Sequence, residues 1–212
     1  AYTRALYDIA DILSNFDVAY RPELDAYSGI LAYDLGFEEE FALHAKKVAD
    51  GLRALDKVVV IDPHTAYALR ELYPKFVDNF EVETVYYLDL LKDLRFKVEP
   101  ELKVTFQDPC YLNRYLKLGG IRPILESVKG VELEKVSSGT STSCCGGPIE
   151  FLYGDRSKFI AKRRAESLRV HGNELFITAC PVCMASFRRV GYRPTDLSTF
   201  LKNSYFQLRN SK

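Results

Sequence analysis

Short apolar runs alternate with helix-patterned segments along most of the chain. In the second half, the apolar run Lys103–Phe106 leads into Asp108-Pro109-Cys110 and then into a helical pattern that extends to about Val128. A second helical pattern, from about Asp155 to Val170, precedes the apolar run Leu175–Ala179. Short apolar strands that alternate with helices are typical of an α/β fold with a largely parallel sheet. We therefore predict an α/β protein.

The first half repeats the same order of elements. Gly36, Phe41 and Pro63 match Gly154, Phe159 and Pro181 at a constant offset of 118 residues. Asp62–Thr65 takes the place of Cys180–Cys183 at the same offset. At an offset of 117, Val58–Ile61 takes the place of Leu175–Thr178, and Tyr27-Ser28-Gly29 that of Cys144-Cys145-Gly146. We predict two pseudo-repeated α/β units. Residues 1–100 form a degenerate, N-terminally incomplete copy without cysteines, and residues 101–212 form the copy that carries the metal site.

Local patterns add three further predictions. Val85–Leu91, in the segment that connects the two halves, has a helix-like pattern. Asn203–Lys212 is expected to be a polar tail that follows a short amphipathic helix. The basic runs Lys162–Arg164 and Arg188-Arg189 are expected to lie on solvated faces, the usual place for short charge runs.

Composition and charge exclude several classes of partner. Lys+Arg and Asp+Glu are equal at 29 each, so the formal net charge is zero. This balance gives no electrostatic footprint for nucleic acid or for an anionic membrane, and it leaves room for a protein partner. No apolar run approaches the ~18–20 residues that span a bilayer. We therefore expect no transmembrane segment in these 212 residues.

The five cysteines all lie between residues 110 and 183 and carry the strongest chemical signal. They follow the pattern Cys-x33-Cys-Cys-x34-Cys-x2-Cys, formed by Cys110, Cys144, Cys145, Cys180 and Cys183. An odd number in a chain of this size does not suit a disulfide framework, so we expect a reducing, cytoplasmic compartment. Each cysteine falls at the carboxyl end of a predicted strand or in a loop beside it, and such ends meet at one sheet edge. The five thiols are therefore expected to converge.

Several kinds of site fit converging thiols. Buried inert cysteines are one interpretation, but the position of these residues at strand ends argues against it. Zinc takes four thiolates, and Cys180-x2-Cys183 is a familiar half-site, although a fifth cysteine is then left over. A dithiol redox motif on Cys180–Cys183 leaves Cys110 and the Cys144-Cys145 pair without a role. The Cys-x2-Cys-x2-Cys run of a bacterial ferredoxin is absent from the sequence.

Three segments together resemble a known family. Asp108-Pro109-Cys110-Tyr111-Leu112-x-Arg114, Cys144-Cys145-Gly146-Gly147-Pro148 and Cys180-Pro181-x-Cys183 are similar to the cysteine-rich CCG domain. That domain occurs in the B and D subunits of heterodisulfide reductase and in related iron–sulfur subunits, often as a paired repeat. The resemblance implies that Cys110, Cys144, Cys145, Cys180 and Cys183 hold an unusual non-cubane [4Fe–4S] cluster, with zinc as the alternative known in some members.

The function implied by this resemblance is electron transfer. We expect an iron–sulfur subunit of a heterodisulfide-reductase-like oxidoreductase that passes electrons to a thiol, disulfide or other substrate, or to a redox partner. The expected partners are other redox subunits, flavin or iron–sulfur proteins, which would also account for peripheral attachment at the inner face of a membrane. The alternative is a zinc-stabilised structural or assembly subunit of a dehydrogenase complex, without a redox role.

Two departures from the family pattern bear on this function. Gln107 stands where the family usually has histidine. The first copy has no cysteines, so a heterodisulfide cleaved between two clusters is not the expected substrate. Because a cubane needs only four protein thiolates, the fifth implies an opened cluster or an exchangeable ligand. We expect Cys144 and Cys145 to supply this catalytic ligand.

Overall fold

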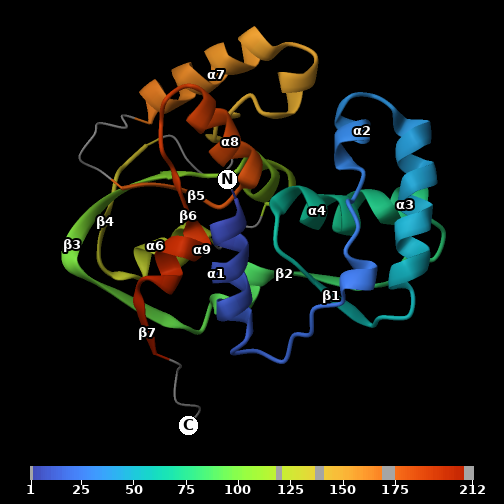
Figure 1. Cartoon of the computed structure of the whole chain (residues 1–212), viewed down its shortest axis with the longest axis horizontal. Helices are drawn as coiled ribbons and strands as arrows, with labels where there is room; N and C mark the ends of the chain where they lie inside the picture. Colours follow the sequence, from blue (N-terminus) through green and yellow to red (C-terminus); the bar gives the residue numbers. More distant parts are fainter. Residues whose placement is uncertain (1, 118–120, 137–140, 169–174, 208–212) are drawn as a thin grey trace. The chain divides into compact units, whose positions relative to one another are not determined.

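Parallel strands with intervening helices confirm the predicted α/β class in a computed structural model that describes residues 2–117, 121–136, 141–168 and 175–207 (Figure 1). The chain divides into two compact units. One combines Ala1–Phe16 with Leu90–Lys212, and the other is Asp17–Asp89. None of the helices within the described ranges is long and apolar enough to cross a membrane.

A sheet with one long central strand forms the base of the unit that contains the cysteines. Among the described residues its order is β4-β3-β5-β6, and β7 also pairs with β3. All pairs are parallel except β3 with β7, which is antiparallel. The strands are β3 (Arg95–Gln107), β4 (Lys129–Leu133), β5 (Leu175–Thr178), β6 (Thr195–Asp196) and β7 (Tyr205–Gln207). Because Tyr205–Gln207 forms a strand, the prediction of a polar tail is wrong there; residues 208–212 lie outside the described ranges.

Helices flank this sheet on two sides, with α7 and α8 above β5 and α1, α6 and α9 below it in Figure 1. Their bounds are α1 (Thr3–Leu13), α6 (Ile121–Glu126), α7 (Gly154–Ser167), α8 (Pro181–Arg189) and α9 (Leu197–Lys202), with a π-helical turn η4 (Tyr111–Tyr115) and a 3-10 turn η6 (Pro148–Phe151). Val104, Phe106 and Ile177 on the central strands are fully buried. The sheet is therefore covered where its strands approach the cysteines.

The helix α1 corrects the predicted domain boundary. Ala5, Ile9 and Ile12 form its buried face, with the helical spacing i, i+4, i+7. The helix packs against α9, and the buried Asp8 accepts a 2.7 Å hydrogen bond from Thr199 Oγ1. The first 16 residues therefore belong to the compact unit of the second half, and the other unit ends at Asp89 rather than at residue 100.

The Asp17–Asp89 unit has a two-stranded parallel sheet of its own among its described residues. Its elements are η1 (Pro22–Leu24), α2 (Ile30–Asp34), α3 (Glu38–Leu52), β1 (Lys57–Val60), α4 (Pro63–Tyr67), η2 (Ala68–Leu72), α5 (Tyr73–Phe76) and β2 (Glu83–Tyr86), and η3 (Tyr87–Leu91) crosses its end. Phe41 packs against Tyr73 and Phe76 at ring-centroid distances of 6.0 and 5.2 Å. An aromatic cluster thus forms this core.

The helix predicted over Val85–Leu91 is only partly present. Val85 and Tyr86 belong to β2, and a 3-10 turn follows from Tyr87 to Leu91. A short apolar run fits a strand and a helix equally well by its periodicity alone. Pairing with β1 decides in favour of the strand here, since Val85 lies opposite Val59 and Tyr86 opposite Val60.

Candidate metal centre

Two neighbouring parallel strands bring three of the cysteines to one sheet edge. The strands β3 and β5 end side by side, with Gln107 opposite Thr178. Cys110 follows β3 and caps the N-terminus of η4. Cys180 follows β5 and caps the N-terminus of α8, and Cys183 lies in the first turn of that helix. A proline occupies the first helical position of α8. Proline suits this position because the backbone N–H that it lacks would have no intrahelical partner there.

The Cys144-Cys145 pair comes from a third segment, which is held between two helices. Gly146 has a φ of +77°, a conformation that side chains other than glycine rarely adopt. A Cβ at Gly147 would lie 2.1 Å from Val182 Cγ1 and 3.0 Å from Ser186 Oγ, both on α8. Among the described residues, the backbone of this glycine pair lies close to α7 and α8. The absence of side chains at both positions therefore allows the segment to pack against these helices. The structure describes the segment that leads into this pair from residue 141 onward.

The five thiols form one continuous row of sulfur contacts. Hydrogen bonds join Cys110 to Cys144, Cys144 to Cys145, Cys145 to Cys183 and Cys183 to Cys180. All five are free cysteines; Cys145, Cys180 and Cys183 are buried, whereas Cys110 and Cys144 are partly exposed. The buried three pack with Phe176 and Phe187 in one apolar cluster. The structure therefore brings together every residue that the sequence assigned to the site.

Charge in this row is concentrated on Cys144. Hydrogen bonds from Cys110 and Cys145 lower the pKa of the Cys144 thiol, and the Gly146 N–H, 3.2 Å from its Sγ, and the charge of Arg114 act in the same direction. The same contacts raise the pKa of Cys110 and Cys145, which donate to Cys144. These shifts favour a thiolate at Cys144 that lies between the protonated thiols of Cys110 and Cys145.

Gln107 connects the three segments that carry the cysteines. Its side-chain amide donates to the carbonyls of Asp108 and Ser143, at 2.9 and 3.3 Å, and its backbone carbonyl accepts from Thr178 Oγ1 at 3.3 Å. Thr142 Oγ1 adds a 2.9 Å bond to the Asp108 carbonyl. Gln107, which the sequence marked only as a departure from the family pattern, therefore forms hydrogen bonds to all three segments that carry the cysteines.

Arg164 is a site residue that the sequence prediction missed. It was expected on a solvated face, but it is 3% exposed and its Nε donates to Gln107 Oε1 at 2.7 Å. The signal lay in the helical spacing, since Ala161, Ala165 and Leu168 share its face of α7 and are buried. A cation–carboxylate pair, Arg122 with the buried Asp108 at 2.9 Å, involves the residue that follows Gln107 in sequence.

The donor set suits a cluster of several irons. Soft thiolates select iron–sulfur clusters and zinc among biological metals, and five thiols from three segments lie in one row of sulfur contacts here. In the residues that the structure describes, no group of three or more His, Cys, Asp or Glu side chains is arranged around a single metal ion. The sulfur atoms hydrogen-bond to one another instead, and a bound metal would replace these S–H···S contacts.

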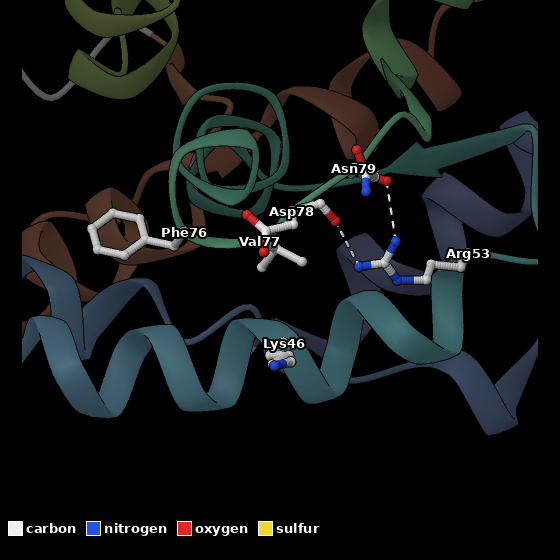
Figure 2. A pocket seen from close by; sticks show the side chains of 6 residues that line it. All are labelled: Lys46, Arg53, Phe76, Val77, Asp78 and Asn79. Atoms are coloured by element: carbon white, nitrogen blue, oxygen red, sulfur yellow. Dashed lines mark hydrogen bonds between the residues drawn. The ribbon is translucent and has the colours of Figure 1, made fainter.

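The Asp17–Asp89 unit has a groove of a different character. It has a volume of about 230 Å³ and is lined by Lys46, Arg53 and residues 76–79 (Figure 2). The Arg53 guanidinium donates to the backbone carbonyls of Asp78 and Asn79, at 2.8 and 3.1 Å. This arginine closes the chain turn at the end of α5, and no redox-active side chain lines the groove among the described residues.

Comparison with known proteins agrees with this site. The model of the CCG cysteine-rich domain matches residues 104–188. A probable membrane-anchored ferredoxin of Chromohalobacter salexigens is 31% identical over 180 residues, which is 77% of this chain and 26% of that protein. The probable iron–sulfur-binding oxidoreductase FadF of Bacillus subtilis is 29% identical over 138 residues, 60% of this chain and 19% of that protein.

A third relative is less similar in sequence. One of the subunits of the fumarate reductase (CoM/CoB) of Methanothermobacter marburgensis is 27% identical over 138 residues, 62% of this chain and 27% of that protein. The chain thus spans between about a fifth and a quarter of the length of these curated relatives. The three cysteine-bearing segments and the sheet edge that unites them all lie in the matched region. The resemblance inferred from the cysteine motifs is confirmed, and residues 104–188 belong to the cysteine-rich CCG domain family.

Proposed function

We propose that this chain is the iron–sulfur part of a heterodisulfide-reductase-like oxidoreductase. In this proposal Cys110, Cys144, Cys145, Cys180 and Cys183 hold a non-cubane [4Fe–4S] cluster, which supplies one-electron transfer when bound. The observation that supports it is the unbroken row of five free thiols contributed by three segments of a CCG domain. The oxidoreductase and ferredoxin names of the relatives support the same redox role.

The chain's own residues determine how such a centre works. Phe176 and Phe187 exclude water from Cys145, Cys180 and Cys183, which keeps these ligands in a low-dielectric environment. Cys110 and Cys144 are both partly exposed, and Cys144 is the member of the Cys144-Cys145 pair that a thiol or disulfide substrate can reach. We assign the catalytic, exchangeable role to the Cys144-Cys145 pair and favour Cys144, because Cys145 is buried.

The Asp17–Asp89 unit is, in this proposal, a copy of the same fold without a cluster. Its strand Lys57–Val60 and the strand Leu175–Thr178 begin 118 residues apart (57 and 175), and Pro63 and Pro181 each start the helix that follows. Gly29 and Gly146 have the matching φ values of +80° and +77°. Asp62 stands where Cys180 would be, and its carboxylate caps α4. One cluster per chain follows.

The wider assignment concerns partners and compartment. Electron transfer through one cluster requires a donor and an acceptor, and the proposed partners are flavin or iron–sulfur subunits of the same complex. Five free thiols suit a reducing, cytoplasmic compartment. Peripheral attachment at the inner face of a membrane would then come through a partner.

Single Cys→Ser variants of all five cysteines test the proposal. Four should lose most of the iron, whereas Cys144→Ser should retain iron but change its electron paramagnetic resonance spectrum and stop turnover. The control is Ser143→Ala, which removes an exposed hydroxyl beside Cys144. Full iron content and unchanged spectra in all five variants would contradict the assignment.

A further inference from the structure

A buried cation lies beneath the loops that carry the cysteines. Arg164, on α7, is 3% exposed. Its Nε donates to Gln107 Oε1 at 2.7 Å, its Nη2 to Thr142 Oγ1 at 3.3 Å and its Nη1 to Ser167 Oγ at 3.3 Å. Two of these acceptors belong to the segments that lead into Cys110 and Cys144. The guanidinium is therefore fixed in place by the same residues that position the thiols.

This charge acts on the sulfur atoms of the site. Burial lowers the pKa of Arg164, whereas the neighbouring Asp108, Cys183 and Cys145 raise it. An arginine stays protonated under these conditions, because its ordinary pKa lies above 12. Cys145 and Cys183 are buried, so their interaction with the guanidinium is little screened by water or salt.

The other charges around the site leave this positive field in place. Asp108 is 1% exposed and accepts from Arg122 Nη2 at 2.9 Å, so its carboxylate is already matched by a cation. It also accepts a 3.1 Å hydrogen bond from the Asn113 amide. Arg164 and Arg122 carry two positive charges and Asp108 carries one negative charge, so these three side chains have a net charge of +1.

We infer that Arg164 is a positioning residue that raises the reduction potential of the metal centre by placing a fixed positive charge beside Cys145 and Cys183. The inference rests on the proposed iron–sulfur function. Reduction adds one electron to the cluster, so a nearby cation stabilises the reduced form more than the oxidised form. Net charge and hydrogen bonds around the sulfur atoms are the means by which proteins set cluster potentials.

The chain supplies a matched pair of substitutions for the test. Arg164→Gln removes the buried charge and keeps a polar side chain. Arg163→Gln removes the same charge from the preceding residue, whose side chain is 72% exposed and pairs with Glu166 at 3.6 Å. Arg164→Lys keeps the charge and changes the hydrogen bonds. The readout is the midpoint potential of the whole chain, titrated with dithionite and mediators and followed by visible absorption and electron paramagnetic resonance.

We expect a more negative midpoint potential in Arg164→Gln, a potential close to the wild type in Arg164→Lys, and no shift in Arg163→Gln. An iron-replete Arg164→Gln protein with the wild-type midpoint would overturn the inference. If Arg164→Gln does not fold, Gln107→Glu places a compensating carboxylate at the Arg164 Nε, and it also removes the amide that donates to the Asp108 and Ser143 carbonyls. That variant should also show a more negative midpoint, and an unchanged value would overturn the inference equally.

Failure of this inference and failure of the proposed function are distinguishable. Iron in the wild type with no shift in either variant rejects the role of Arg164 alone. A wild type that binds no iron rejects both.

Discussion

Gly147 offers a sharp test of how the site is assembled, because a single methyl group there meets α8. Its φ of −59° and ψ of −49° are ordinary for alanine, so Gly147→Ala introduces no backbone strain. The new Cβ would lie 2.1 Å from Val182 Cγ1, 3.0 Å from Ser186 Oγ and 3.5 Å from Cys145 Sγ. Val182 stands between Cys180 and Cys183 on α8. A shift of α8 away from Gly147 that relieves the clash would separate the two halves of the thiol row.

The magnitude follows from two opposing terms. Overpacking of a filled site costs about 1–3 kcal/mol, and the upper half of that range applies because carbon atoms pack best at about 3.5–4.0 Å. Replacing glycine by alanine restricts the unfolded chain and contributes about 0.4–1 kcal/mol in favour of folding. The expected net loss in the free energy of unfolding is about 1–2.5 kcal/mol.

Urea denaturation of the apo protein and the iron content of anaerobically purified protein measure the two consequences. The control is Gly154→Ala at the start of α7, where the added Cβ meets no heavy atom within 4 Å. That variant should be as stable as the wild type or slightly more stable, and should keep its iron. Val182→Ala in the Gly147→Ala background removes the contacting methyl, so we expect it to restore iron binding with a favourable coupling energy of about 1 kcal/mol.

The reasoning is wrong if Gly147→Ala matches Gly154→Ala in both stability and iron content. It is also wrong if Val182→Ala adds its own loss to that of Gly147→Ala, because the two positions would then act independently.

Two further predictions concern the partly exposed carboxylate of Asp62 and the buried carboxylate of Asp108, and both are measured by urea denaturation. Asp62 Oδ1 accepts the N–H groups of His64 and Thr65, both at 3.0 Å, so Asp62→Ala should cost about 1 kcal/mol and Asp62→Asn much less. Burial raises the pKa of Asp62 but these hydrogen bonds outweigh it and lower the pKa; the loss in Asp62→Ala should therefore be full above about pH 4 and shrink as the pH falls through the lowered value. Arg122→Leu leaves the buried Asp108 without its ion-pair partner and should cost about 3 kcal/mol, most of which Asp108→Asn in the same chain should recover.

The convergence of the thiols could be predicted because it depends on the order in which strands and cysteines follow one another in the sequence. Cys110 and Cys180 each follow the apolar end of a strand, and parallel neighbouring strands place their carboxyl ends together. The helix and strand that precede Cys180 were likewise expected from periodicity, and α7 and β5 match those expectations within about two residues where the structure describes them.

What the sequence did not reveal depends on partners distant in the chain. Gln107 and Arg164 are 57 residues apart, and only the fold shows that they share a hydrogen bond. The amphipathic pattern of α1 predicts a buried face but not that α9, almost at the other end of the chain, covers it. Arg164 was expected to be exposed because its neighbours in the sequence are charged. Its position on the apolar face of α7 causes it to be buried instead.

The most direct test of the central claim is the iron, sulfide and zinc content of the wild-type chain purified without oxygen from iron-replete cells. A brown protein with about four iron and four sulfide per chain is the predicted result, because one unit carries the thiols and the other carries none. About eight iron per chain would contradict the assignment of a single centre. Stoichiometric zinc without iron would contradict the redox function itself and would favour a structural role for the five cysteines.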